Sequence, residues 1–279
     1  MFGENQSFII ALILYSLSTI AYFIFFIFIK EKLGNYGSIL VKLGLAFHTV
    51  SLATRTVQAS RLPISNQYEF ATSFAWGISL FYLLFEKKYR YKILGAFATP
   101  IILILIYYAA MQSKDIRPLM PALQSNWIVI HVLTAIFSYG AFAVACAISI
   151  MYVLRDHLKE DTFTRKHMPS LDLLDAMSYR SIAVGFITLT LVIVTGAIWA
   201  EKAWGRYWQW DPKETWSFIT WVIYSIYLHV RLTKDWKGKK AAWFSIIGFA
   251  SILFTYIGVN TILVGYHSYS FMLFPFYFN

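Results

Sequence analysis

Long apolar segments constrain this chain of 279 residues more than any other feature of its sequence. Hydrophobic residues make up 58% of it, charged residues 14%, and the mean hydropathy of +0.57 lies far above that of soluble domains. About twenty apolar residues cross a hydrocarbon core of about 30 Å. The sequence therefore predicts an all-α integral membrane protein, folded as a single polytopic membrane domain over residues 1–279. About eight transmembrane helices are expected, near residues 8–29, 39–57, 69–85, 93–111, 127–153, 181–200, 216–231 and 242–263.

The basic residues predict how these helices are oriented. The chain has 24 lysines and arginines against 14 acidic residues, and its net charge of +10 could suggest a nucleic-acid partner. Seventeen of the 24, however, lie at one set of helix ends rather than in one patch, and basic loops of membrane proteins face the cytoplasm. We therefore expect a lipid bilayer and no nucleic acid as partner. Both termini and the loops at 58–70, 112–126 and 201–216 are expected on the outer side.

Tryptophan gathers in the loop over residues 201–216. Residues 204–216 read WGRYWQWDPKETW, and six of the ten tryptophans lie between positions 199 and 221. An ordinary interfacial aromatic belt would spread over all loops. A porphyrin needs an aromatic bed, cations for its propionates and a close approach of the backbone. The loop offers Trp204, Trp208 and Trp210 as the bed, Lys202, Arg206 and Lys213 as the cations, and Gly205 for the close approach.

The residues that follow these tryptophans allow two interpretations. Asp211 stands directly before Pro212 and three residues before Glu214, which is the pattern of a helix N-cap with proline in the first turn and an acid at the positive end of the helix dipole. Asp211 and Glu214 are therefore either structural residues that start the next helix or members of a binding site. The sequence leaves both interpretations open.

The histidines are the candidates for a binding site, because an ionisable side chain within a membrane is costly and usually has a function. Two of the six histidines lie in the charged loop at 155–180, where we expect solvated side chains and a short amphipathic helix. His131 and His267 lie near the outer ends of their segments, level with the tryptophans. His229 lies about 20 Å deeper along its helix, and His48 lies near the middle of the second span.

This spacing favours one kind of metal ligand. A lone intramembrane histidine often only hydrogen-bonds a neighbouring helix. This structural role is less favoured for His131 and His267, because both lie at the same level as the tryptophan-rich loop. A compact zinc or copper site is disfavoured, because the sequence has no HxxxH, HxH or cysteine–histidine cluster. Single imidazoles from different helices suit a planar metal ligand held from both faces, and haem between two histidines is the natural case.

Cys146 is the only cysteine of the chain, and it stands among small apolar residues in the middle of the fifth span. A buried thiol of this kind behaves as a small hydrophobic side chain and is rarely reactive. A single cysteine also excludes an internal disulfide and a CxxC pair. Any thiol that takes part in the chemistry must therefore come from a partner.

Several segments of the chain resemble the CcsA (ResC-type) proteins of cytochrome c biogenesis, which belong to the WWD-domain haem-handling family. They read SYRSIAVGFITLT, GAIWAEKAWGRYWQWDPKETWSFITW, YLHVR and YIGVN followed by HSYS. The resemblance covers most of the chain and is strongest over residues 172–270. The DPKETW continuation and the eight-span length favour this type over the shorter CcmC and the longer CcmF proteins. Ser60 replaces a usual glycine and GYHSYS replaces the commoner GLHSYG, and neither change touches an expected ligand.

The resemblance implies a function in haem delivery. It implies a subunit of a cytochrome c haem lyase (holocytochrome c synthase) that binds haem b as a substrate and presents it for thioether attachment to the CxxCH motif of apocytochrome c. The implied partners are a ResB/CcsB-type membrane subunit, apocytochrome c and thiol-reducing thioredoxin-like proteins. The implied location is a multi-pass protein of a bacterial plasma membrane, with a plastid thylakoid as the alternative.

The resemblance also assigns roles to individual residues. His131 and His267 match the two outer histidines that bind haem iron axially, and His229 matches an intramembrane ligand at an inner haem site. His48 matches no family ligand. The residues expected to contact the cofactor are His131, His267, His229, Trp204, Trp208, Trp210, Asp211 and Arg206.

Two other functions stay open from sequence alone. The chain could be a haem exporter, with attachment performed by another subunit. It could also be a haem-free membrane assembly scaffold whose tryptophan-rich loop docks a protein.

Overall fold

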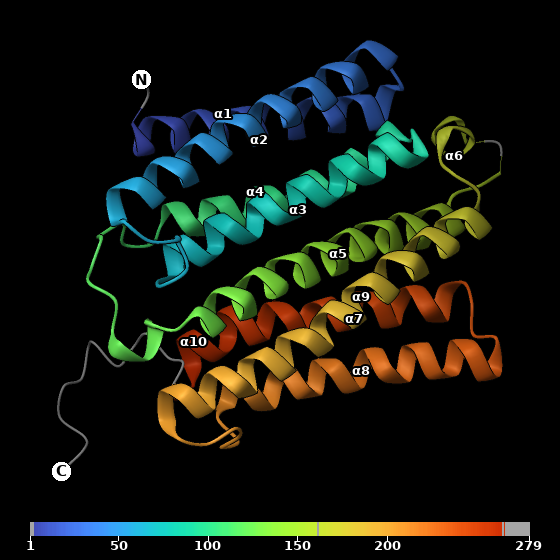
Figure 1. The fold of residues 1–279 in the computed structure, drawn as a ribbon. Helices are drawn as coiled ribbons and strands as arrows, with labels where there is room; N and C mark the ends of the chain where they lie inside the picture. Colours follow the sequence, from blue (N-terminus) through green and yellow to red (C-terminus); the bar gives the residue numbers. More distant parts are fainter. Residues whose placement is uncertain (1–2, 161, 264, 266–279) are drawn as a thin grey trace.

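The computed structural model describes residues 3–160, 162–263 and 265, with the side chain of residue 163 left out, and the described part is built of helices without strands (Figure 1). The expected all-α class is confirmed. The elements are α1 (Glu4–Phe28), α2 (Glu31–Ala59), α3 (Gln67–Tyr89), η1 (Lys92–Leu94), α4 (Gly95–Ala110), η2 (Pro121–Leu123), α5 (Asn126–His157), α6 (Phe163–His167), α7 (Leu171–Trp204), α8 (Pro212–Lys234), α9 (Lys239–Leu253), the π-helical segment η3 (Phe254–Gly258) and α10 (Val259–Ile262).

Six of the helical segments in the described part are long and apolar enough to cross a membrane, and α3 and α8 complete the approximate count of eight. Both of these helices have 23 residues, but they are less apolar than the other six. They correspond to the two shortest segments expected from the sequence. The six are Glu4–Phe28, Glu31–Ala59, Lys92–Ala110, Asn126–His157, Leu171–Trp204 and Lys239–Ile262.

The acids of α3 face other helices rather than the outside. Glu86 is buried and accepts hydrogen bonds from the hydroxyls of Tyr22, Ser38 and Tyr82, with 2.8 Å between Tyr22 Oη and Glu86 Oε2. Buried carboxylates are tolerated when their oxygens are hydrogen-bonded in this way. The low hydropathy of α3 therefore reflects polar contacts inside the helix group.

The long helices run back and forth in two groups joined by α5. Helices α1 to α4 form one group, and α5, α7, α8 and the α9–η3–α10 helix form the other, with α5 packed against α3, α4, α7 and α9 (Figure 1). The N-terminus of α1 lies at the same end of the bundle as the segments 60–66, 111–125 and 205–211. We call this end the loop end.

One boundary differs from the sequence-based expectation. The helix α7 begins at Leu171, so the LDLLDAM stretch is the first part of a long helix rather than a separate amphipathic helix in a loop. The Ser170 hydroxyl accepts a hydrogen bond from the backbone N–H of Leu173 at 3.2 Å and caps the helix there.

Small residues bring α5 and α7 close together. The α5 sequence from 140 to 147 reads GAFAVACA, and serines bond across the interface. The Ser138 hydroxyl donates to the Gly185 carbonyl at 2.9 Å, and Ser181 donates to the Ala141 carbonyl at 2.7 Å. Small residues and hydroxyls of this kind are the usual means by which membrane helices pack tightly.

A buried ion network holds the loop end together. The Arg55 side chain is 2% exposed and donates to Glu69 at 2.9 Å and to Glu4 at 3.1 Å. Glu69 is fully buried and also accepts from Arg61 at 2.8 Å and from the backbone of Ser65 at 2.8 Å. The network therefore joins α1, α2, α3 and the segment between α2 and α3.

Replacing Glu69 by Gln is expected to destabilise the fold, because it leaves two arginines without their shared carboxylate. Breaking a buried ion pair from one side costs about 3 to 5 kcal/mol. Thermal unfolding in detergent should show a clear fall in midpoint for Glu69→Gln. The matched control is Asp115→Asn, whose side chain forms an exposed pair with Arg117 at 3.5 Å and should change little. Equal midpoints for the two variants would contradict a stabilising role of the network.

Candidate functional site

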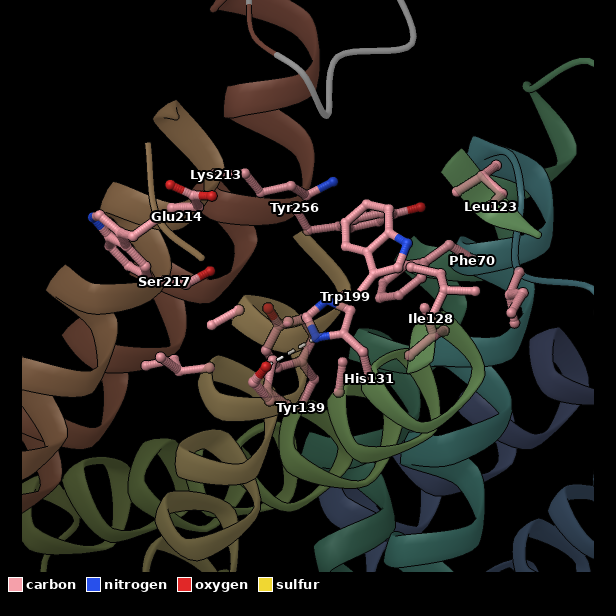
Figure 2. Close-up of a pocket in the computed structure, with 18 of the residues that line it drawn as sticks. Phe70, Leu123, Ile128, His131, Tyr139, Trp199, Lys213, Glu214, Ser217 and Tyr256 are labelled. Carbon is pink, nitrogen blue, oxygen red and sulfur yellow. Dashed lines mark hydrogen bonds between the residues drawn. The ribbon is translucent and has the colours of Figure 1, made fainter. Parts of the chain in front are cut away.

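A cavity opens at the loop end between α5, α7, the start of α8 and the π-helical segment. The volume of the cavity is about 110 Å³. The cavity lies within about 940 Å³ of atom-free space, which includes the part open to solvent. Figure 2 shows Lys213, Glu214 and Ser217 on the α8 side and Phe70, Leu123 and Ile128 on the other, with His131 and Trp199 between them. The lining residues are Ile64, Phe70, Leu123, Ile128, His131, Val132, Ala135, Tyr139, Val192, Ile193, Gly196, Ala197, Trp199, Tyr207, Trp208, Lys213, Glu214, Ser217 and Tyr256.

His131 lines this cavity from α5 and is oriented by α7. Its Nδ1 lies 2.9 Å from the carbonyl oxygen of Val192, which accepts only if Nδ1 carries the proton (Figure 2). In the neutral imidazole, a proton on Nδ1 puts the lone pair on Nε2, which is the tautomer of a metal-binding histidine. Gly196 makes the contact possible, since a Cβ there would lie 2.8 Å from His131 Cε1.

Trp199 forms the wall beside His131. The two rings stack with 6.1 Å between centroids and 18° between planes, and the Trp199 side chain is 3% exposed. The indole N–H of Trp199 donates to the Ala122 carbonyl at 2.8 Å, which ties the segment 111–125 to α7. Trp204 packs edge-on against Trp199 at 4.7 Å, so it supports the wall rather than lining the cavity.

The tryptophan-rich loop has an inner and an outer face. Trp208 lines the cavity, whereas Trp210 is 68% exposed and meets Trp208 edge-on at 5.7 Å. Arg206 is also exposed. Gly205, expected to let the backbone approach a ring, instead ends α7 with a φ of 74°, a left-handed conformation that glycine adopts at helix C-termini.

Asp211 and Glu214 form a capping box at the start of α8, so the predicted helix N-cap is confirmed. Asp211 accepts from the backbone N–H of Lys213 at 2.8 Å, and Glu214 accepts from the backbone N–H of Asp211 at 3.2 Å. Glu214 also accepts from the N–H of Gln209 at 2.8 Å. These bonds flank Trp210, whose φ of 56° is unfavourable for a large side chain, and hold it in place.

The π-helical segment brings residues of the last helix to the cavity. π-helical turns are often found at functional sites. Tyr256, within this segment, lines the cavity and donates to the Gln67 carbonyl of α3 at 3.1 Å. Asn260 is buried and donates to the Tyr256 carbonyl at 2.5 Å.

Lys213 reaches the cavity from the first turn of α8, ahead of the segment 216–231 expected to cross the membrane. Its ammonium donates to Asn260 Oδ1 at 3.1 Å. Burial lowers the pKa of Lys213 to about 8, and the negative charge of Asp211 opposes this shift.

His229 and His48 lie away from this cavity. His229 is exposed on α8, seventeen residues after Pro212 and hence near the opposite end of the bundle. His48 is buried between α2 and α1, with its Nδ1 at 3.3 Å from the Tyr15 hydroxyl. His267 lies outside the described residues. Within the described part of the chain, no three histidine, cysteine, aspartate or glutamate side chains form a metal-binding group.

Five aromatic residues that line the cavity were not among the contacts expected from the sequence, namely Phe70, Tyr139, Trp199, Tyr207 and Tyr256. Phe70, Tyr139 and Tyr256 come from three different helices and line the same space (Figure 2). Tyr256 and Asn260 are the first and last residues of YIGVN. The sequence therefore indicated them only because that segment resembles CcsA-type proteins. No local pattern marks Phe70 or Tyr139 among the many aromatics of α3 and α5.

Comparisons with known proteins identify the family. The family model of the Cytochrome C assembly protein matches residues 64–267. The cytochrome c biogenesis protein CcsA of Guillardia theta is 35% identical over 296 residues, covering 97% of this chain and 96% of that protein. The chain belongs to the cytochrome c assembly family as a CcsA-type protein.

Other CcsA proteins show the same similarity. The protein of Chlamydomonas reinhardtii is 40% identical over 227 residues, covering 79% of this chain and 64% of its own length. A protein of the cyanobacterium Prochlorococcus marinus is 36% identical over 278 residues, covering 86% of both chains. The expected CcsA resemblance is confirmed.

A solved structure shares the fold of this CcsA-type chain. It is the cytochrome c haem lyase CcmF, with a TM-score of 0.73 and 15% identity, and the match covers 92% of this chain and 47% of that one. The chain therefore spans about half the length of CcmF.

The close contact between Gly196 and the His131 ring allows a test of the site. In Gly196→Val the added carbons collide with the His131 ring and displace it from the Val192 carbonyl. We expect purified Gly196→Val to retain its thermal unfolding midpoint within a few degrees and to carry much less haem, measured by absorbance per protein. Gly205→Asn is the control, because nothing lies within 4 Å of that position and asparagine tolerates a left-handed φ. Wild-type haem content in Gly196→Val would contradict this role of the cavity.

Proposed function

We propose that this chain binds haem b as a substrate in the cavity at the loop end and presents it for thioether attachment to the CxxCH motif of apocytochrome c. It acts together with a ResB/CcsB-type membrane subunit as part of a cytochrome c haem lyase. The observation that carries the proposal is His131, with its Nδ1 2.9 Å from the Val192 carbonyl oxygen and its ring stacked on Trp199 in an aromatic cavity. Membership in the cytochrome c assembly family supports the same function.

The cavity suits a flat ring better than a compact ion. Aromatic side chains from α3, α5, α7, the loop and the last helix line it, and His131 provides one imidazole. Aromatic faces bind a porphyrin plane, and an imidazole binds its iron axially. The narrow interior favours a ring that enters by one edge and leaves the other accessible to a second protein.

The second outer ligand is proposed to be His267. This residue lies outside the described part, but Gly265 is described and lies against the start of α8, where a Cβ on it would collide with the Asp211 carboxylate. The chain thus returns to the tryptophan-rich loop two residues before His267. Asp211, Trp204, Trp208, Trp210 and Arg206 are proposed to shape the loop around the bound haem.

The thiols of the reaction come from the substrate. Haem supplies vinyl groups, and each substrate thiol adds across one of them, so that sulfur bonds to one carbon and the proton goes to the other. Cys146, the only cysteine, is buried in α5 away from the cavity and takes no part. What this chain does is bind, orient and shield the ring.

His229 is proposed to serve an inner haem site. Its side chain is exposed on α8 within an apolar segment, so it is open to a partner subunit that brings the second ligand. An exposed histidine facing lipid alone would be costly. Haem is proposed to enter there and to move outward to the loop end, which we place on the outer side of the membrane. A bacterial plasma membrane or a plastid thylakoid fits this orientation.

Replacing His131 by Ala is expected to remove haem from the outer site. The complex purified with its partner subunit should bind haem about tenfold or more weakly there, lose the low-spin spectrum of two histidine ligands, and form little thioether-linked product with a reduced CxxCH peptide. His157→Ala is the control, because His157 is exposed at the opposite end of the bundle. An unchanged spectrum in His131→Ala would refute the proposal. Wild-type complex that binds haem without forming thioether would favour export instead.

Replacing His229 by Ala tests the direction of haem movement. If haem enters at the inner site, His229→Ala depletes both sites, whereas His131→Ala leaves haem at the inner site. Haem content and absorption spectra of the two single variants and the double variant separate these cases. Full haem content and wild-type cytochrome c yield in His229→Ala would rule out an inner site at this residue.

A further inference from the structure

A second cavity lies at the loop end, next to the one that contains His131. Its volume is about 280 Å³, and it is lined by the residues at the start of α3 and by residues of the segment 111–125. Leu123 lines both cavities, so the two meet at this side chain. Figure 2 shows Leu123 at the side of the first cavity opposite Lys213. A molecule in the second cavity therefore lies beside the occupant of the first.

The lining of the second cavity is chemically mixed. Met120 and Leu123 contribute apolar surface, and the charged members that the structure describes, Asp115 and Arg117, have opposite signs and pair at 3.5 Å. This composition favours a neutral polar ligand over an anion. Amides and hydroxyls both donate and accept hydrogen bonds, as the peptide groups of an extended chain require. The side chains of this kind are Ser65, Asn66, Gln67, Gln112 and Ser113.

Two glutamine amides of this lining are oriented by one tyrosine. Gln67 Oε1 accepts from the Tyr108 hydroxyl at 3.1 Å, and Gln112 Nε2 donates to the Tyr108 carbonyl at 3.3 Å. Within the described part of the chain, these are the hydrogen bonds of the two side-chain amides. The Gln67 amino group remains as a donor and the Gln112 oxygen as an acceptor. One donor and one acceptor match the carbonyl and the N–H of a peptide chain.

The wall of the second cavity is already held in place. Arg55 donates to the carbonyls of Lys114 at 2.9 Å and Asp115 at 3.3 Å, so the buried ion network fixes one end of the segment 111–125. The Trp199 indole fixes the other end through the Ala122 carbonyl at 2.8 Å. A site that is formed before its ligand arrives loses less free energy to ordering when it binds.

We infer that the second cavity binds the polypeptide of apocytochrome c beside its CxxCH motif, and that it thereby places the two thiols at the accessible edge of the haem ring. This inference rests on the proposed function. The cavity binds the residues that flank the motif, because the thiols themselves must lie at the ring. Since the cavities meet at Leu123, a chain bound in the second one runs past this side chain to the first.

The experiment compares two reduced peptides as substrates of the full chain purified with its partner subunit. One is the CxxCH pentapeptide, and the other carries about ten further residues on each side, enough to span about 33 Å each. KM and kcat of thioether formation on bound haem are measured for wild type and for Gln112→Trp, which fills the second cavity. The wild type is expected to have a KM for the extended peptide about tenfold below that for the pentapeptide.

Gln112→Trp is expected to raise the KM of the extended peptide to that of the pentapeptide and to leave kcat unchanged. The reason is that the substitution removes binding that the ground state and the transition state share. Ser113→Trp is a second filling variant at an exposed position of the same lining, and it should act in the same way. Haem content and the absorption spectrum show that each variant is folded.

The matched control is Gln58→Trp, which changes an exposed glutamine at the end of α2, outside the lining of both cavities. It should leave the ratio of the two KM values unchanged. Because this ratio is read for every variant, a general loss of stability cancels. The inference is overturned if the wild type does not prefer the extended peptide, or if the filling variants keep the wild-type preference.

The result is separable from the proposed function. If the wild type binds no haem, or forms thioether with neither peptide, the proposed function fails and the inference fails with it. If both peptides react in a way that depends on His131 but have equal KM values, only the inference about the second cavity fails.

Discussion

The close approach of α5 and α7 is the constraint on which the rest of the site depends. Alanines and glycines of α5 let the backbones come together, and the Ser138 and Ser181 hydroxyls bond to carbonyls of the facing helix. Because α5 enters from the loop end, the same packing places His131 beside Gly196 and within 2.9 Å of the Val192 carbonyl. Helix packing therefore decides which nitrogen of the imidazole carries the proton, and with it whether the ring can bind a metal.

A second set of interactions, which is ionic, holds the loop end together. Arg55 and Glu69 are buried among apolar helices, and each is stabilised by more than one partner. The Arg55 guanidinium also donates to the Lys114 carbonyl at 2.9 Å, so the network holds the segment 111–125 as well. Trp199 bonds to the same segment through Ala122. The wall of the cavity is thus connected to the ion network through the loop that covers it.

Much of the fold could be predicted from the sequence, because long apolar segments and helix caps are local signals. The capping box at Asp211 and the all-helical architecture follow from composition and spacing alone. The cavity could be predicted only in part. His131 and Trp208 were identified by type and depth, but Tyr139, Phe70 and Tyr256 meet only through tertiary packing, which no local pattern encodes. The division of the loop into an inner Trp208 and an outer Trp210 also depends on one residue with a positive φ.

That division explains why the tryptophan-rich loop is so constrained. Trp210 adopts a left-handed backbone conformation that costs on the order of 1 kcal/mol or more for a large side chain, and the N–H groups on either side of it are both bonded to Glu214. With a negative φ at Trp210, the chain would turn differently between Trp208 and α8. Glu214, in the first turn of α8, therefore also sets the orientation of Trp210. Lys213 lies within the same first turn, so one capping box fixes both an aromatic wall and a positive charge on the α8 side of the cavity.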